Sequence, residues 1–306
     1  MLYNNILDAI GNTPLIRLTN IEKKYNLGFN LYAKMERSNP SGSVKDRAAL
    51  YIIKDAIDKG LIKENTEIIE ATSGNTGISL SMISSYLKHK CTLIMPSSAS
   101  IERIKIMKAY GANVILTDAS LGMKGSVELA EKMHNENPDS FIADQFNNES
   151  NIKAHYEGTS KEILRDLDGK IDAFIAGYGT AGTLSGCSKR FKEYNPNILT
   201  VGVAPLDSPH KIQGIGANFT PNNLKKEYVD DITYVSNKDA YEGARILSKE
   251  EGIFAGISSG AALMGAINYN RESLKGKNVV IVLPDNGERY LSVEGLYEWY
   301  LKRFIR

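Results

Sequence analysis

The sequence has few residues of the kinds that build metal centres and disulfide frameworks. Only two of its 306 residues are cysteines, Cys91 and Cys187, and they lie far apart in the chain. Its four histidines follow no ligand spacing such as H-x-x-x-H. The sequence therefore supports neither a disulfide framework nor a zinc site, and we expect two ordinary buried thiols.

An excess of charge and long apolar runs are also missing. The chain has 37 basic and 36 acidic residues, a net charge of +1, which provides no basic field for nucleic acid or an anionic membrane. Apolar runs such as residues 279–284 are too short to span a bilayer. Residues 1–13 lack the basic start and apolar stretch of a signal peptide. We expect a cytoplasmic protein that binds neither nucleic acid nor membrane.

What the sequence does contain is a regular alternation of short apolar runs and longer amphipathic ones. This alternation predicts an α/β fold with largely parallel sheets and right-handed crossovers. Since 42% of the residues are hydrophobic, the chain can bury one large core or two smaller ones. We place a domain boundary near Asp144, which gives domains 1–144 and 145–306. The expected strands are 31–35, 67–70, 92–95, 113–116, 173–176, 199–203 and 279–283, and the expected helices are 44–59, 76–87, 101–110, 125–133, 152–167, 182–194 and 240–250.

Ligands of such sheets bind in the loops that follow strands, and four loops here are unusual. The first, residues 39–47 (NPSGSVKDR), joins an expected strand to an expected helix that Ser43 is suited to cap. Lys45 then falls in the first helical turn, where the helix dipole disfavours a cation. Lys45 is either a solvated lysine or one whose pKa the site lowers for Schiff-base formation.

The second loop, residues 72–77 (TSGNTG), is made entirely of small polar residues. Its two glycines allow the backbone to approach a ligand closely, and the N–H groups at a helix N-terminus favour an anion. An ordinary capped turn needs fewer such residues. We therefore interpret this loop as a binding loop, most simply for a carboxylate.

The third loop, residues 177–183 (GYGTAGT), fits the dinucleotide pattern G-x-G-x-x-G, which alone is a weak signal. A dinucleotide site also needs an acidic residue about 20 positions later, and Ala204 stands where it should be. Thr180 and Thr183 instead suit a phosphate monoester, whose terminal oxygens need several donors.

The fourth loop, residues 256–262 (GISSGAA), opens an apolar helix and presents a neutral hydroxyl. Together the four loops favour a ligand with a phosphate, an electrophilic carbon for a lysine, and a carboxylate partner. Pyridoxal phosphate with an amino acid meets these requirements.

Two further segments stand out beside the four loops: 209–216 (PHKIQGIG) and 284–290 (PDNGERY). The six segments together resemble one enzyme family, cysteine synthase (O-acetylserine sulfhydrylase), with the catalytic core of cystathionine β-synthase as a close relative. They occur in the family's order and cover nearly the whole chain. The resemblance implies two α/β domains, each with a mainly parallel sheet flanked by helices, in the pyridoxal-phosphate fold of tryptophan synthase β.

The resemblance also implies a role for individual residues. Lys45 matches the Schiff-base lysine, Asn75 the residue that bonds the 3′ oxygen of the cofactor, and Ser258 the partner of its pyridine nitrogen. The phosphate cup matches Gly179, Thr180, Gly182 and Thr183, and the substrate carboxylate site matches Thr72, Ser73, Thr76 and Gln145.

The implied reaction replaces the β-substituent of a cysteine-type amino acid through an α-aminoacrylate, most simply making cysteine from O-acetylserine and sulfide. The alternative is sulfide-releasing replacement on L-cysteine, with lanthionine, cystathionine or serine as product. A nicotinamide-dependent oxidoreductase is the alternative from another class. The resemblance further implies a homodimer whose N-terminal segment crosses onto the C-terminal domain, and serine acetyltransferase as a candidate partner.

Three departures from the family pattern bear on specificity. The segment between the strand ending near Val203 and Pro209 is short, and Ala204 replaces the usual acid. Asn218 stands where cysteine synthases usually carry glycine, which makes it a specificity candidate. Ala181 replaces a frequent glycine, and we expect a small packing change there. The first two changes are either neutral loop variation or a change in the nucleophile or first substrate that the site admits.

Overall fold

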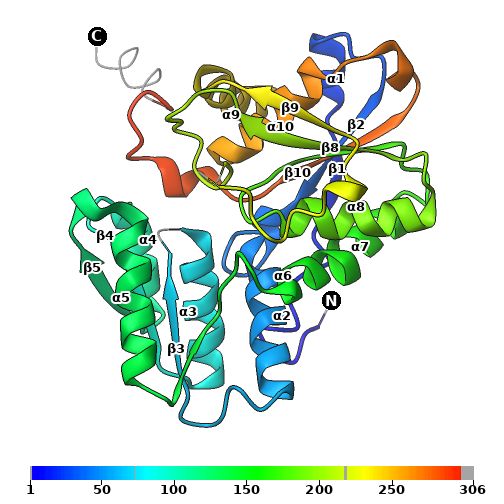
Figure 1. The fold of residues 1–306 in the computed structure, drawn as a ribbon. Helices are drawn as coiled ribbons and strands as arrows, with labels where there is room; N and C mark the ends of the chain where they lie inside the picture. Colours follow the sequence, from blue (N-terminus) through cyan, green and yellow to red (C-terminus); the bar gives the residue numbers. More distant parts are fainter. Residues whose placement is uncertain (1, 73, 217–218, 298–306) are drawn as a thin grey trace.

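The computed structural model describes residues 2–72, 74–216 and 219–297, which form two sheets with helices on their faces (Figure 1). The larger sheet has the order β1-β2-β10-β7-β8-β9; β1 runs antiparallel to β2, and the remaining pairs are parallel. The smaller sheet has the order β5-β4-β3-β6 with parallel pairs. The strands are β1 (Leu15–Arg17), β2 (Asn30–Met35), β3 (Glu67–Ala71), β4 (Cys91–Pro96), β5 (Asn113–Thr117), β6 (Ser140–Ile142), β7 (Ala173–Gly177), β8 (Leu199–Pro205), β9 (Asp231–Val235) and β10 (Asn278–Leu283).

The central strands of the larger sheet are covered by helices on both faces. One core packs α9 (Asn237–Glu251) and α10 (Ile257–Asn268), with α1 (Thr19–Lys24), against strands that include β2 and β8. A second core packs α7 (Ser160–Asp166) and α8 (Gly182–Tyr194) against the other face. Because both faces are covered, β10 reads as a continuous apolar run rather than an alternating one.

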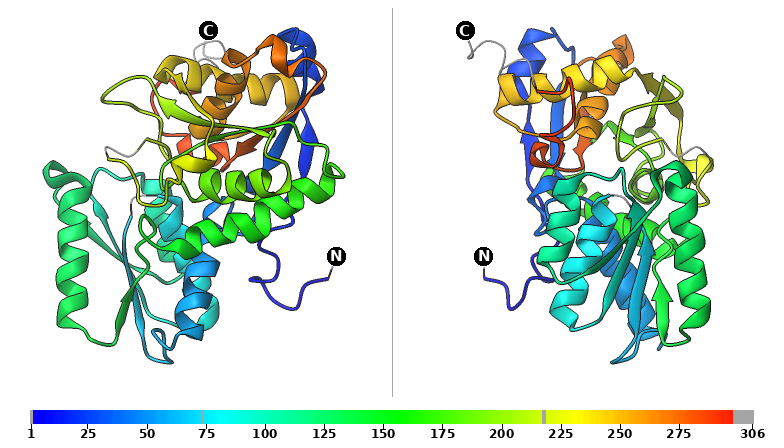
Figure 2. Two further views of the ribbon diagram at one scale, coloured as in Figure 1. Left: turned by 45° about the vertical axis from the view of Figure 1, so that its right-hand side comes forward. Right: turned by 90° about the vertical axis from the view of Figure 1, so that its left-hand side faces the viewer.

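The smaller sheet is covered in the same way. Helices α2 (Lys45–Asp58), α3 (Asn75–Leu87) and α4 (Ile101–Ala109) pack against one face, and α5 (Gly122–Glu136) packs against the other. Both views in Figure 2 keep this sheet and its helices below the larger one. Within the described ranges, no helix combines the length and the apolar composition that a membrane crossing needs.

The α/β fold class with two mainly parallel sheets is confirmed, and so are the seven expected strands. Three strands, β1, β6 and β9, and helix α1 were not expected. The expected helix 152–167 is divided into α6 (Glu149–Ala154), a π-helical turn η3 (His155–Thr159) and α7.

The expected boundary near Asp144 falls between β6 and α6. Strands β1 and β2 precede it in sequence but belong to the larger sheet, so the N-terminal segment runs into the sheet of the C-terminal half. The division into domains 1–144 and 145–306 stays a prediction.

Candidate active site

One pocket brings together seven of the predicted site residues from four separate loops. They lie where strands β2 and β7 end and where helices α2, α3, α8 and α10 begin. In this way the parallel sheets place loops that are distant in sequence at a common edge. The pocket is lined by Val44, Lys45, Asn75, residues 177–183, Gly214, Ile215, Ser258, Val282 and Pro284.

Lys45 is the first residue of α2. Val44, not Ser43 as expected, is the N-cap residue, but the Ser43 hydroxyl still accepts a hydrogen bond from the Lys45 N–H at 3.3 Å. Burial lowers the pKa of Lys45 to about 8, against the opposing influence of the Asp285 carboxylate. A larger fraction of the Lys45 amine is therefore unprotonated near neutral pH than for a solvated lysine.

The loop before Lys45 is held by its own neighbours. Gly42 has φ +84°, and a side chain there would lie 2.9 Å from the Arg289 guanidinium, so only glycine fits. The carboxylate of buried Asp46 accepts hydrogen bonds from the Ser41 N–H at 2.7 Å and from the Ser79 hydroxyl at 2.5 Å. These contacts fix the backbone that carries Lys45.

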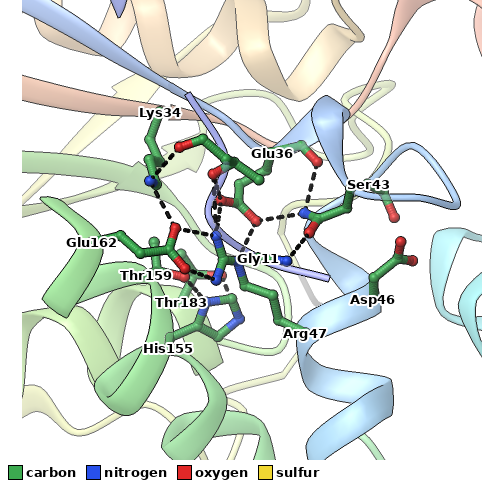
Figure 3. Close-up of polar contacts among 12 residues, drawn as sticks. Gly11, Lys34, Glu36, Ser43, Asp46, Arg47, His155, Thr159, Glu162 and Thr183 are labelled. Atoms are coloured by element: carbon green, nitrogen blue, oxygen red, sulfur yellow. Dashed lines mark hydrogen bonds and ion pairs between the residues drawn. The ribbon is translucent and has the colours of Figure 1, made fainter. Parts of the chain in front are cut away.

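A buried ionic cluster lies directly behind the start of α2 (Figure 3). Arg47 donates to both oxygens of Glu36, at 2.7 and 2.8 Å, and to both oxygens of Glu162, at 2.7 Å each. The fully buried Lys34 lies 2.8 Å from Glu162 and donates to the Thr13 carbonyl at 2.7 Å. Bidentate pairing of this kind offsets the desolvation of the charges. It joins α2 to β2, to α7 and to the N-terminal segment.

The predicted phosphate cup lies at the N-terminus of α8. A side chain at Gly179 would come within 2.6 Å of the Gly214 carbonyl, and one at Gly182 within 2.0 Å of the Asn151 side chain. Glycine at these positions lets the loop pack closely against Gly214 and Asn151. Backbone N–H groups at a helix start favour an anion. Ala181, the N-cap residue, is left-handed at φ +66°. Its replacement of glycine is therefore a change of backbone preference and not only of packing.

Each threonine hydroxyl of the cup has a hydrogen-bonding partner in residues 149–159. Thr180 Oγ1 accepts from Asn151 Nδ2 at 3.0 Å, and Thr183 Oγ1 lies 3.2 Å from His155 Nε2. Burial lowers the pKa of His155 to about 3, so its ring is neutral. Because its single proton is not used on Asn151, the Thr180 hydroxyl can donate into the cup.

Comparison with known proteins identifies the family. Residues 6–285 match the family model described as pyridoxal-phosphate dependent enzyme. The chain belongs to this family.

Individual relatives of this pyridoxal-phosphate dependent enzyme are close over their whole length. It is 47% identical to cysteine synthase B of Campylobacter jejuni over 302 residues, 96% of this chain and 98% of that protein. The cysteine synthase of Entamoeba histolytica superposes with a TM-score of 0.94 at 41% identity, covering 97% of this chain and 91% of that one. A hydrogen sulfide-producing enzyme of Fusobacterium nucleatum superposes with a TM-score of 0.90 at 46% identity, covering 95% and 100%.

The residues present fit the cofactor of this family. An amine (Lys45), an anion cup at a helix N-terminus (Gly179 to Thr183) and a buried neutral hydroxyl (Ser258) line one pocket. The amine would bind the aldehyde of pyridoxal phosphate, the cup its phosphate and the hydroxyl its ring nitrogen. Membership of this family also replaces the dinucleotide interpretation of residues 177–183.

The residues predicted to bind the substrate carboxylate form a second group beside Asn75. Thr72, Thr76 and Gln145 are all buried, and Thr76 donates to Gln145 Oε1 at 2.6 Å. The Gln145 amide oxygen is thus used, and its N–H groups, which no residue in the described ranges accepts, can donate to a ligand. Among the described residues, these three do not line the pocket that holds Lys45. Ser73 and the specificity candidate Asn218 lie outside the described residues.

Several residues that support the site were not predicted individually. Asn151 and His155 contact the cup, and Asp285 and Arg289 contact Asn75. Asp285 and Arg289 lie in segment 284–290, which is one of the six segments that carry the family resemblance but whose residues were given no role. Their contacts join positions more than 200 residues apart, which sequence spacing does not reveal.

Proposed function

We propose that this pyridoxal-phosphate dependent enzyme makes cysteine by exchanging the acetate group of O-acetylserine for sulfide. The observation that carries the proposal is the single pocket that joins Lys45, the anion cup and Ser258. The cysteine synthases among its relatives support the choice of reaction.

The cofactor, when bound, supplies an electron sink that stabilises negative charge at the substrate α-carbon. Lys45 Nζ would hold the cofactor and, once released by the substrate, take the α-proton, for which a pKa of about 8 suits it. Thr72, Ser73, Thr76 and Gln145 would hold the substrate carboxylate. Gly179, Thr180, Gly182 and Thr183 would hold the phosphate, and Asn75 would donate to the ring oxygen.

Ser258 directs the outcome of the reaction. A neutral hydroxyl cannot hold a positive charge on the ring nitrogen as a carboxylate would, so the electron sink is weaker. A weaker sink favours prompt loss of the β leaving group over a long-lived carbanion. Ser258 is 2% exposed, which keeps water from supplying a different partner.

A second candidate function is release of sulfide from L-cysteine by β-replacement, with lanthionine, cystathionine or serine as product. The similarity to the hydrogen sulfide-producing enzyme of Fusobacterium nucleatum favours it. The short segment 204–208 and Asn218 are the candidates for this change of substrate.

One experiment tests both functions. The purified enzyme is mixed with O-acetylserine and sulfide, and separately with L-cysteine alone, and the products are identified by mass spectrometry. We expect cysteine and acetate from the first mixture. Sulfide with a thioether or serine product from the second mixture would assign the second function instead. Lys45→Ala is the control, and we expect it to make none of these products.

We also propose that the enzyme is a cytoplasmic homodimer with serine acetyltransferase as a candidate partner. The resemblance to cysteine synthase supports these assignments. Light scattering of the purified enzyme, alone and mixed with serine acetyltransferase, tests the assembly: a mass of one chain would contradict the dimer, and an unchanged mass in the mixture would contradict the partner.

A further inference from the structure

The side-chain amide of Asn75 is held at both of its ends by residues from the C-terminal part of the chain. Asn75 Nδ2 donates to Asp285 Oδ2 at 2.7 Å. Asn75 Oδ1 accepts a short hydrogen bond from Arg289 Nη1. Asn75 begins α3, whereas Asp285 and Arg289 follow β10 at the opposite end of the sequence.

These two partners leave the amide only one orientation. A carboxylate accepts hydrogen bonds and an arginine guanidinium only donates them. If the amide oxygen and nitrogen were exchanged, two acceptors would face each other at Asp285 and two donors at Arg289. One N–H of Asn75 is used on Asp285, and no residue in the described ranges accepts the second. Asn75 lines the pocket, so this N–H is the donor that it can offer there.

Asp285 is itself fixed by contacts with three parts of the site. It is 1% exposed, and Tyr290 donates its hydroxyl to the same Oδ2 at 2.5 Å. Its carbonyl accepts from the Gly256 N–H at 3.2 Å, two residues before Ser258. Asp285 also forms an antiparallel bridge with Ser43, two residues before Lys45.

Arg289 is anchored just as firmly. It is 4% exposed, and its Nη2 donates to the Ser41 carbonyl in the loop that leads to Lys45. The left-handed Gly42 lets this loop pass close to the guanidinium. The nearby Asp285 and Asp46 carboxylates balance its charge. Both ends of the Asn75 amide therefore rest on rigid, buried groups.

We propose that Asp285 and Arg289 are positioning residues that fix the Asn75 amide so that it donates to an anionic ring oxygen of the cofactor. This inference rests on the proposed role of Asn75 and deepens it. It gives segment 284–290 a function at the active site: the segment sets which hydrogen-bonding group Asn75 offers to the pocket.

A double-mutant cycle tests whether Asp285 acts through Asn75. The dissociation constant of pyridoxal phosphate from the apoenzyme and the visible absorbance maximum of the loaded enzyme are measured for wild type, Asp285→Ala, Asn75→Ala and the double variant. We expect Asp285→Ala to weaken cofactor binding about tenfold and to move the absorbance maximum in the same direction as Asn75→Ala. In the Asn75→Ala background, we expect Asp285→Ala to change binding by less than about twofold.

Tyr269→Phe is the matched control, because it removes a tyrosine–aspartate hydrogen bond of 2.8 Å, to Asp231 Oδ2, that involves neither Asn75 nor Asp285. We expect it to leave the absorbance maximum in place and binding within about twofold of wild type. An equal loss from Asp285→Ala in both backgrounds, or from Tyr269→Phe, would overturn the inference. If Asp285→Ala does not fold, Asp285→Leu replaces it in the same cycle. If wild type binds the cofactor and makes cysteine but the cycle shows no coupling between Asp285 and Asn75, the positioning role alone is refuted. If wild type binds no cofactor, the proposed function is refuted.

Discussion

Lys45 and Glu70 are two side chains near the proposed substrate-binding loops, and burial shifts their pKa values in opposite directions. It lowers the pKa of Lys45 and raises that of Glu70, in each case to about 8, because the neutral form is the one that a buried environment favours. Glu70 lies near the end of β3, just before Thr72, and accepts the Asp144 N–H at 3.0 Å. A protonated Glu70 therefore supports the turn that carries Gln145.

Glu70 makes the stability of the protein dependent on pH. Its pKa is raised in the folded state, so the folded protein keeps a proton that the unfolded chain releases above its ordinary pKa of 4.5. The stabilising contribution is complete below that value and is lost as the pH rises through about 8. We predict that the free energy of unfolding falls between pH 5 and pH 8.5 in wild type and falls less in Glu70→Gln. The difference is at most about 5 kcal/mol, since each unit of raised pKa corresponds to about 1.4 kcal/mol.

Urea denaturation of both proteins at the two pH values measures this difference. Glu64→Gln, at an exposed position before the same strand, is the control and should follow wild type. Parallel pH dependences for wild type and Glu70→Gln would show that Glu70 does not carry the proton.

At the scale of elements, the ionic cluster around Arg47 fixes where α2 starts. It connects α2 to Glu36, directly after β2, and to Glu162 in α7. The pKa of the Glu36 carboxyl is lowered by the charge of Arg47 and its hydrogen bonds, although burial alone would raise it. Removing Arg47 would therefore leave two buried carboxylates without their main partner.

We predict that Arg47→Met lowers the free energy of unfolding by about 3–5 kcal/mol, the range for breaking a buried ion pair on one side. Arg17→Met is the matched control, because Arg17 pairs with Glu22 at the surface with its side chain 45% exposed. We expect this second change to cost less than about 1 kcal/mol. Chemical denaturation compares the two, and equal losses would refute a special role for the cluster.

The elements that the sequence predicts best are those with enough residues to show a period. The central strands are continuous apolar runs because helices cover both faces. Strands β1 and β6 have three residues each, which is too short for a pattern, and β9 is a partly exposed edge strand. The π-helical turn η3 interrupts a helix whose apolar pattern continues, so the pattern alone predicts one helix.

The same distinction applies to the candidate site. Lys45, Asn75 and the cup residues lie in loops rich in glycine and hydroxyl groups, which sequence reasoning finds because few other structures need them. Asp285, Arg289 and Asn151 contact those residues from distant parts of the chain. The sequence singles out segment 284–290 but does not show these contacts, and it gives no signal for Asn151. Such supporting residues become visible only when the fold places them.

At the scale of the whole molecule, Asn151 in α6 connects the two predicted ligand-binding regions. Its Nδ2 donates to the Gln145 carbonyl at 2.8 Å and to Thr180 Oγ1 at 3.0 Å. Gln145 follows β6 of the smaller sheet, and Thr180 follows β7 of the larger one. Asn151 is 1% exposed and lies against Gly182 of the cup. One side chain thus sets the spacing between the cup and the carboxylate site.

We predict that Asn151→Ala weakens pyridoxal phosphate binding and raises the KM for O-acetylserine together, each by about tenfold, as expected for a buried hydrogen bond left unmade. Asn223 separates the two effects, because its Nδ2 donates to the same Gln145 carbonyl at 3.0 Å and, within the described ranges, no hydrogen bond joins it to Thr180. Asn223→Ala should therefore raise the KM and leave cofactor binding within about twofold of wild type. Equilibrium dialysis of the cofactor and steady-state kinetics measure the two quantities. If Asn151→Ala changes only one of them, the two regions are positioned independently and α6 does not couple them.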